Sequence, residues 1–160
     1  MAIQVGDKLP AGRFTVMNAD GPGSDSIEDL FGGKKVVLFS VPGAFTPTCS
    51  KDHLPGFIEQ SAALQAKGVD LIACMAVNDV FVMDAWGKQH SAEGKVAMLA
   101  DGSGVYSKAL GLELDLSDRG LGVRSSRFAL VIDDNVVTQA FIEEGGAFAV
   151  SSAENVLANL

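Results

Sequence analysis

The stretch from Lys35 to Cys49 reads KVVLFSVPGAFTPTC, and it decides how the rest of the chain is interpreted. Its first half, up to Val41, contains the unbroken apolar run Val-Val-Leu-Phe. Continuous apolarity, rather than alternation, is typical of a strand that is covered on both faces. Its second half begins with Pro42-Gly43 and ends with a threonine–proline pair and a cysteine. The stretch therefore predicts a buried strand, a turn and the first turn of a helix.

The residues that follow complete a β-α-β unit. Residues 50–67 have helical spacing with Gly68 as a stop, and Val69 to Val77 is a second continuous apolar run. Two parallel strands joined in this way make a right-handed crossover in nearly all proteins.

Ser151 and Glu154 have the spacing of a capping box at the start of the last helix. Further helices are expected at 79–90, 103–110 and 151–160, and shorter strands at 14–17 and 96–100.

The C-terminal part of the sequence predicts antiparallel pairing. Phe128 to Ile132 and Val136 to Phe141 flank the turn sequence Asp-Asp-Asn, which is typical of a β-hairpin. Residues 18–24 and 113–122 are rich in turn formers and are expected to be loops. We therefore predict one α/β domain, residues 1–160, with a mixed central sheet flanked by helices. This order of elements resembles a thioredoxin-like core.

The composition is that of an acidic globular protein. The 160 residues include 12 Lys and Arg against 20 Asp and Glu, a formal net charge of −8. This charge argues against nucleic acid and anionic membranes as partners, because both attract basic surfaces. No apolar run approaches the roughly 20 residues that a membrane-spanning helix needs, and no signal peptide is recognisable, so we expect a cytoplasmic protein. With two cysteines and two histidines in no metal-ligand spacing, we expect neither a metal nor another cofactor.

Cys49 lies where the predicted helix begins. Thr46 is a favourable N-cap and Pro47 a favourable first helical residue, so Cys49 is expected in the first turn. Unpaired backbone N–H groups and the helix dipole favour a thiolate there, and the thiolate is the nucleophilic form of cysteine. The carboxyl end of a strand is also where ligands bind in open α/β sheets. The alternative is an inert cysteine that only packs in the core.

The segment from Pro42 to Ser50, followed by His53-Leu54-Pro55-Gly56-Phe57, resembles the active-site stretch of peroxiredoxins. It is similar in particular to the type II branch, which includes atypical two-cysteine animal enzymes and glutaredoxin-dependent plant and bacterial ones. The resemblance extends over nearly the whole chain. It implies a thioredoxin-like fold and a thiol-dependent peroxidase that reduces hydrogen peroxide and organic hydroperoxides. Further matching segments are Val77-Asn78-Asp79, Ala85-Trp86-Gly87-Lys88, Arg127-Phe128, Glu143-Glu144-Gly145-Gly146 and Ser151-Ser152-Ala153-Glu154.

The resemblance implies a role for five residues. Cys49 matches the peroxidatic cysteine, whose thiolate attacks the hydroperoxide and becomes a sulfenic acid. Arg127 would lie beside Cys49 and donate hydrogen bonds to the sulfur and the peroxide, although Arg124 is a rival when the residues alone are considered. Besides these, the hydroxyl of Thr46 would contact the peroxide, Pro42 would shield the thiolate from water, and backbone N–H groups near Gly43 would bind substrate.

His53 lies one helical turn after Cys49 and is interpreted as a structural histidine rather than a catalytic base.

Two ways of reducing the sulfenic acid stay open. A cysteine matching Cys74 is the resolving residue in plant type II enzymes. The animal enzymes have theirs near the C-terminus, where this chain has Val150-Ser151-Ser152 instead. Cys74 lies inside an apolar run, so it is equally interpreted as a buried strand cysteine that cannot easily meet Cys49. An external thiol would then complete the cycle, either glutathione with glutaredoxin or thioredoxin.

The resemblance also implies a homodimer, with an interface near Phe45 and Phe81. A competing interpretation is a thioredoxin-like binding or holdase module in which Cys49 is inert. A thiol–disulfide oxidoreductase is less favoured, because Thr46 stands where a Cys-x-x-Cys motif requires its first cysteine.

Overall fold

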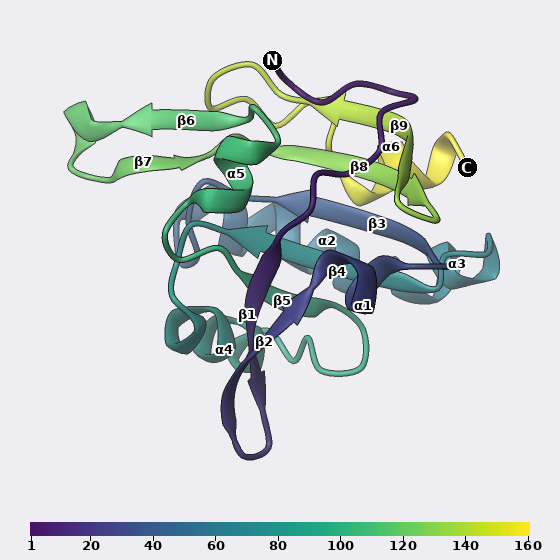
Figure 1. Ribbon diagram of the computed structural model, residues 1–160, viewed down its shortest axis with the longest axis horizontal. Coiled ribbons are helices and arrows are strands. Elements are labelled where there is room, and N and C mark those ends of the chain that lie inside the picture. The colour runs from purple at the N-terminus through teal and green to yellow at the C-terminus, as the bar shows by residue number, and fades with distance from the viewer.

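A seven-stranded mixed sheet runs through the computed structural model, which describes residues 1–160 (Figure 1). Strands β3, β4 and β5 at its centre are parallel, β8 and β9 continue antiparallel beyond β3, and β1 and β2 continue antiparallel beyond β5. The α/β fold class with a mixed sheet is thereby confirmed. In spatial order the strands are β2 (Gly21–Ser26), β1 (Arg13–Asn18), β5 (Ala97–Ala100), β4 (Leu71–Ala76), β3 (Lys35–Ser40), β8 (Phe128–Asp133) and β9 (Val136–Ile142).

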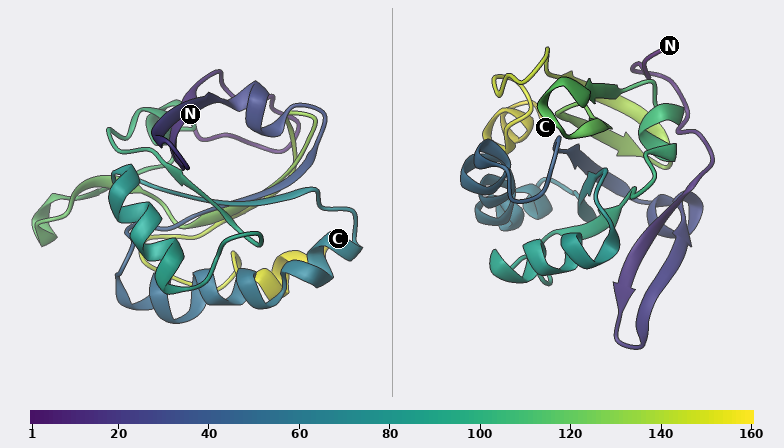
Figure 2. Two further views of the ribbon diagram at one scale, coloured as in Figure 1. Left: turned by 90° about the horizontal axis from the view of Figure 1, so that it is seen from below. Right: turned by 90° about the vertical axis from the view of Figure 1, so that its left-hand side faces the viewer.

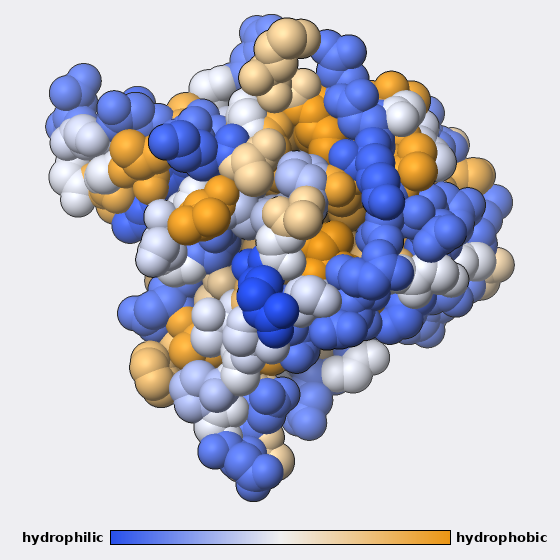
Figure 3. All heavy atoms as spheres, in the orientation of Figure 1, coloured by the Kyte–Doolittle hydropathy of each residue, from blue (hydrophilic) through white to orange (hydrophobic).

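Helices cover both faces of this sheet, which is why its central strands are apolar throughout (Figure 2). One face packs against α2 (Leu54–Glu59), α3 (Ser61–Ala66), α4 (Val80–Gln89) and α6 (Ala153–Ala158). The other packs against α1 (Ile27–Phe31), α5 (Val105–Ala109) and the N-terminal segment. Hydrophilic residues cover most of the face seen in Figure 3. No helix of the structure combines the length and the apolarity that crossing a bilayer requires.

Alternation along the strands places both cysteines on the same side of the sheet. Phe39 on β3 pairs with Cys74 on β4, and both belong to the core beneath α2. Cys49 belongs to the same core, since it lies in the first turn of the helical region that covers this face. The neighbouring strand residues Leu38 and Ala73 point to the opposite face.

The helix expected over 50–67 is divided into three pieces. Residues Cys49–His53 form a π-helical turn, in which Leu54 N donates to the carbonyl of Cys49, and α2 and α3 follow with a break at Gln60. Pro55 has no N–H to donate, and its ring crowds the preceding turn, so a regular α-helix cannot continue through it. The wider π-turn accommodates the proline and sets the direction in which the Cys49 side chain leaves the helix.

Two expected loops contain strands. Within residues 18–24, β2 pairs with β1 as a hairpin. The loop expected over residues 113–122 contains β6 (Glu113–Leu116) and a 3₁₀ turn (Ser117–Arg119), and β7 (Gly122–Ser125) begins at its end. Strands β6 and β7 pair with each other and form an arm that projects from the sheet (Figure 1, green). Residues of these strands are half-buried or exposed at every position but Ser125, and backbone pairing holds them, so they lack the apolar runs from which the other strands were predicted.

Helix α4 provides a test of how much its N-cap contributes. The Asp79 carboxylate accepts from Val82 N at 2.8 Å, whereas Asp84 on the same helix makes a surface ion pair with Lys88 at 2.9 Å. We expect Asp79→Ala to lower the free energy of unfolding by about 1 kcal/mol, because it leaves a helix N–H unpaired. Asp84→Ala is the matched control, with a much smaller loss because water screens an exposed pair. Urea denaturation of both variants measures the difference, and equal losses would contradict the assignment of the cap.

Candidate active site

The loop after β3 is fixed by contacts with the neighbouring strand ends. Val41 N donates to Met75 O at 3.2 Å, and Ala44 N donates to the side chain of Asn78 at 2.9 Å. A Cβ at Gly43 would lie 2.8 Å from Arg124 Nη1, so a larger residue would displace the guanidinium of Arg124 from this loop. The loop is thereby held at the carboxyl end of the parallel strands.

Arg127 reaches Cys49 because of the register between β3 and β8. Ser40, the last residue of β3, pairs with Phe128, so Arg127 lies beside the loop that follows β3. Arg127 Nη2 donates to Cys49 Sγ at 3.1 Å. Cys49 is 0% exposed and Arg127 4% exposed, so the guanidinium and the sulfur meet out of contact with bulk water. The sulfur therefore accepts its hydrogen bond from a charged donor inside the protein.

His53 is the second partner of Arg127. Its Nδ1 lies 2.9 Å from Arg127 Nη1, and its Nε2 lies 2.9 Å from Ser151 O. Burial, reinforced by the neighbouring Arg127 charge, lowers the pKa of His53 to about 3. The ring is therefore neutral, with Nε2–H donating to Ser151 O and Nδ1 accepting from Arg127. Both ring nitrogens are occupied, which leaves no free base for the Cys49 proton.

Thr46 stands at the start of the helix, but its hydroxyl is used differently from the expected cap. Ser50 N donates to Thr46 O at 2.9 Å, which begins the helix, while Thr46 Oγ1 donates to Gly43 O at 2.6 Å. The hydroxyl thus closes the preceding turn instead of accepting from a helix N–H. Its hydrogen is committed, so its oxygen presents lone pairs only.

The two candidate arginines have different partners. Arg127 contacts the sulfur, whereas Arg124 on β7 donates through Nη1 to Pro42 O at 3.2 Å and through Nε to Leu121 O at 2.8 Å. Arg124 therefore joins the projecting β6–β7 arm to the loop after β3, in which Pro42 is half-buried. Both residues belong to the same region, at different distances from Cys49.

Cys74 lies in the centre of β4 and is 0% exposed. Burial raises the pKa of Cys74 well above its ordinary value, and the nearby Cys49 adds to the rise. Neither cysteine forms a disulfide in this structure. Because Cys74 is paired on both sides, to Phe39 and Met98, it cannot approach Cys49 without disruption of the strand.

Several residues around the site were given no function by sequence reasoning. The hydroxyl of Ser151 donates to Glu143, so Ser151 is not the N-cap of α6 that the capping-box spacing predicted. The N-cap is Ser152, whose hydroxyl accepts from Asn155 N at 3.1 Å. Trp86 Nε1 on α4 donates to Ser50 Oγ at 2.9 Å, next to Cys49. No spacing within the sequence connects these residues, because each contact joins segments that only the folded sheet brings together.

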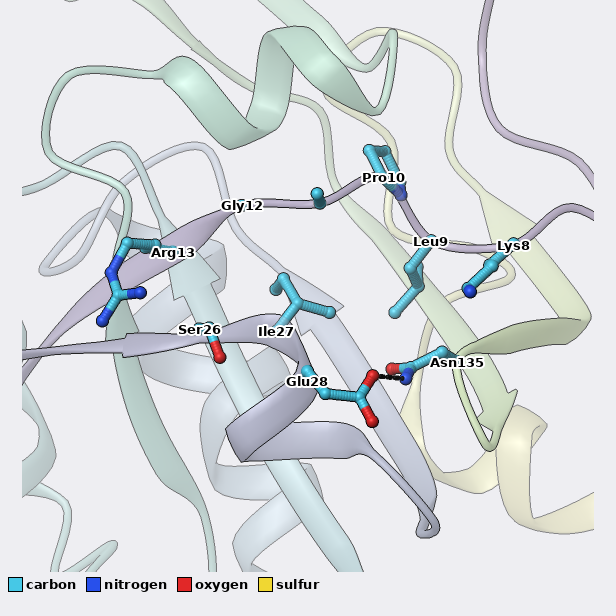
Figure 4. A pocket seen from close by; sticks show the side chains of 10 residues that line it. Lys8, Leu9, Pro10, Gly12, Arg13, Ser26, Ile27, Glu28 and Asn135 are labelled. Atoms are coloured by element: carbon cyan, nitrogen blue, oxygen red, sulfur yellow. Dashed lines mark hydrogen bonds between the residues drawn. The ribbon is translucent and has the colours of Figure 1, made fainter.

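Two hollows of the surface lie away from Cys49. One of about 410 Å³ lies under residues 8–13, where Figure 4 shows Asn135 donating to Glu28, a contact of 2.7 Å. Another of about 840 Å³ lies between α4 and strands β1 and β5. Neither is lined by a cysteine, and nowhere in the structure do three His, Cys, Asp or Glu side chains gather as metal ligands.

Comparison with known proteins places this site in a family. Residues 4–157 match the Redoxin family. Peroxiredoxin-2B of Arabidopsis thaliana is 56% identical over 156 residues, covering 97% of this chain and 96% of the relative, and Peroxiredoxin-2C of Oryza sativa subsp. japonica has the same identity and coverage. Reduced Prx3 from Vibrio vulnificus in complex with H₂O₂ superposes with a TM-score of 0.94 at 50% identity, covering 98% of both chains. The chain belongs to the Redoxin family and, within it, to the type II peroxiredoxins.

Proposed function

We propose that Cys49 is the nucleophile with which this thiol peroxidase reduces hydroperoxides. The observation that carries the proposal is the buried hydrogen bond from Arg127 Nη2 to Cys49 Sγ, 3.1 Å long. A thiolate attacks a peroxide and a thiol does not, and a guanidinium against the sulfur favours the thiolate. The related Prx3 from Vibrio vulnificus, solved in complex with H₂O₂, supports hydrogen peroxide as one substrate.

The first step oxidises the sulfur and breaks the O–O bond. The Cys49 thiolate attacks the terminal oxygen of the hydroperoxide, and an S–O bond forms as the O–O bond breaks. The terminal oxygen keeps its hydrogen and becomes the hydroxyl of a sulfenic acid. The other oxygen leaves with the electron pair and takes a proton to give an alcohol, or water from hydrogen peroxide.

The residues around the sulfur supply the contacts that this step needs. Arg127 Nε is buried and has no partner within the protein, so we assign it as a donor to the peroxide. Thr46 Oγ1, whose own hydrogen is committed to Gly43 O, is assigned as the acceptor for the O–H of the peroxide. Pro42, which has no N–H, shields the thiolate from water, and backbone N–H groups near Gly43 are further donors.

An external thiol is our proposal for the second step. A thiol attacks the sulfenic acid of Cys49, a mixed disulfide forms, and water leaves; a second thiol then displaces Cys49 and takes over the disulfide. The burial of Cys74 and its raised pKa support this cycle over one in which Cys74 resolves. Glutathione with glutaredoxin is the proposed reductant, and thioredoxin is the alternative.

We also propose a homodimer in the cytoplasm. Phe45 is 49% exposed and Phe81 64% exposed, and both lie at the N-terminal end of α4, where an interface would cover them. Two free cysteines support a reducing compartment.

The products of oxidation distinguish the two cycles. After one equivalent of hydrogen peroxide without added thiol, we expect intact-mass spectrometry to show a gain of one oxygen atom in the wild type and in Cys74→Ser. We expect no change in Cys49→Ser, because its hydroxyl is not nucleophilic. Loss of two hydrogens in the wild type alone would assign Cys74 as the resolving residue. Unimpaired peroxide consumption by Cys49→Ser would overturn the proposed nucleophile, whereas an unchanged mass in both the wild type and Cys74→Ser would favour a binding module.

Arg127→Lys tests the guanidinium. A lysine keeps the charge but replaces the two Nη atoms that meet His53 and Cys49 with a single nitrogen, so we expect the rate constant for oxidation by hydrogen peroxide to fall roughly 10–100-fold. The exposed Arg119 has no such partners, and Arg119→Lys is the matched control. Stopped-flow measurement of peroxide consumption compares them. Equal rates for the two variants would remove Arg127 from the mechanism.

The dimer is tested by charge at its proposed interface. We expect Phe81→Glu to shift the sedimentation coefficient from that of a dimer to that of a monomer, since a buried carboxylate without a partner is strongly unfavourable. Val136→Glu, on β9 and 37% exposed in the wild type, is the control and keeps the dimer. If Phe81→Glu sediments as the wild type does, this surface is not the interface.

A further inference from the structure

Glu143 is a buried carboxylate that takes no part in the proposed chemistry. It follows the last residue of β9 and is 6% exposed. Its Oε2 accepts four hydrogen bonds from one short segment: from the N–H groups of Ala149 at 2.8 Å, Val150 at 2.9 Å and Ser151 at 2.9 Å, and from the Ser151 hydroxyl at 2.7 Å. The carboxylate therefore fixes the backbone of residues 149–151.

The segment that Glu143 holds meets the active site at two points. The carbonyl of Ser151 accepts from His53 Nε2 at 2.9 Å. The centroid of the Phe148 ring lies 4.9 Å from the centroid of the His53 ring. It lies 5.7 Å from Arg127 Cζ. His53 in turn accepts from Arg127 through Nδ1. A continuous chain of contacts thus leads from the carboxylate to the guanidinium.

We propose that Glu143 is a positioning residue for the peroxidase reaction, acting through Ser151 and His53 to aim Arg127 at Cys49. The inference rests on the proposed roles of Cys49 and Arg127. Glu143 itself touches neither the sulfur nor the substrate. Its effect is to fix the Ser151 carbonyl, which orients the His53 ring, whose Nδ1 then sets the angle of the guanidinium.

The protonation states along the chain fit this role. Burial raises the pKa of Glu143, but the hydrogen bonds from Ser151, Val150 and Ala149 outweigh it and leave the pKa below its ordinary value. The group is therefore an acceptor-only carboxylate, and hydrogen bonds to it are about twice as strong as neutral ones. Neutral His53 offers one donor and one acceptor, so a fixed acceptor at Ser151 O determines that Nδ1 is free to accept from Arg127.

A substitution at Glu143 affects the side chain without removing the backbone contact nearby. Glu143 N donates to Arg127 O at 3.0 Å, and this bond does not depend on the carboxylate. The next residue, Glu144, is exposed and has no hydrogen bond through its side chain. Glu144→Gln therefore removes the same charge one residue away and is the matched control for Glu143→Gln.

The test compares two reactions of the same sulfur. Alkylation by iodoacetamide, at a pH where its rate has reached its plateau, requires only the thiolate, whereas reduction of hydrogen peroxide also requires the guanidinium in place. For Glu143→Gln we expect the ratio of the peroxide rate constant to the alkylation rate constant to fall about 10-fold. Glu144→Gln keeps the wild-type ratio. Ser151→Ala, which removes one of the four hydrogen bonds, lowers the ratio about threefold and keeps the test open if Glu143→Gln does not fold.

A double-mutant cycle shows whether the effect passes through Arg127. If it does, Glu143→Gln lowers the ratio no further in the Arg127→Lys background. An additional loss there, or a wild-type ratio in both Glu143→Gln and Ser151→Ala, overturns the inference. Failure of the proposed function gives a different result: Cys49→Ser stays active, or Arg127→Lys alone keeps the wild-type rate.

Discussion

The buried guanidinium of Arg127 is the constraint on which the rest of the site depends. A cation without partners is strongly unfavourable inside a protein, and Arg127 is 4% exposed. The structure meets this requirement with a sulfur on one side, a neutral imidazole on the other and the face of Phe148. A charged histidine in place of neutral His53 would repel it. The hydrogen bond to Cys49 therefore helps to satisfy the buried charge of Arg127, so the proposed nucleophile and the stability of the site depend on the same contact.

The sheet brings these partners together from four distant segments. The pairing of β3 with β8 sets Arg127 beside the site loop, and the pairing of β8 with β9 carries the chain on to Glu143. The π-turn places Cys49 and His53 on the covered face. The ends of β8 and β9 and the π-turn after β3 meet at one edge of the sheet, so the proposed active site lies at the carboxyl edge of the parallel strands and not in either of the two hollows.

The sequence predicts those features that have a local signal. The apolar runs indicate β3 and β4, and the Thr-Pro-Thr-Cys spacing places Cys49 in the first turn of a helix, because apolar periodicity and helix-start residues act within a few residues. Strands β2, β6 and β7 depend on backbone pairing between half-buried and exposed residues, so no apolar run marks them. The hydroxyl of Thr46 turns to Gly43 because the loop geometry offers that carbonyl, and the Glu143–Ser151 contact exists only after β9 and α6 have docked.

The contact between Trp86 and Ser50 makes the fluorescence of the protein sensitive to the conformation next to Cys49. The chain has one tryptophan, and its indole is 0% exposed and donates to a residue adjacent to Cys49. A rearrangement of the π-turn breaks that hydrogen bond or admits water to the ring, and either change alters the emission of an indole. Intrinsic fluorescence therefore follows the conformation around the sulfur in real time, without a label and without a second chromophore of the same kind to obscure it.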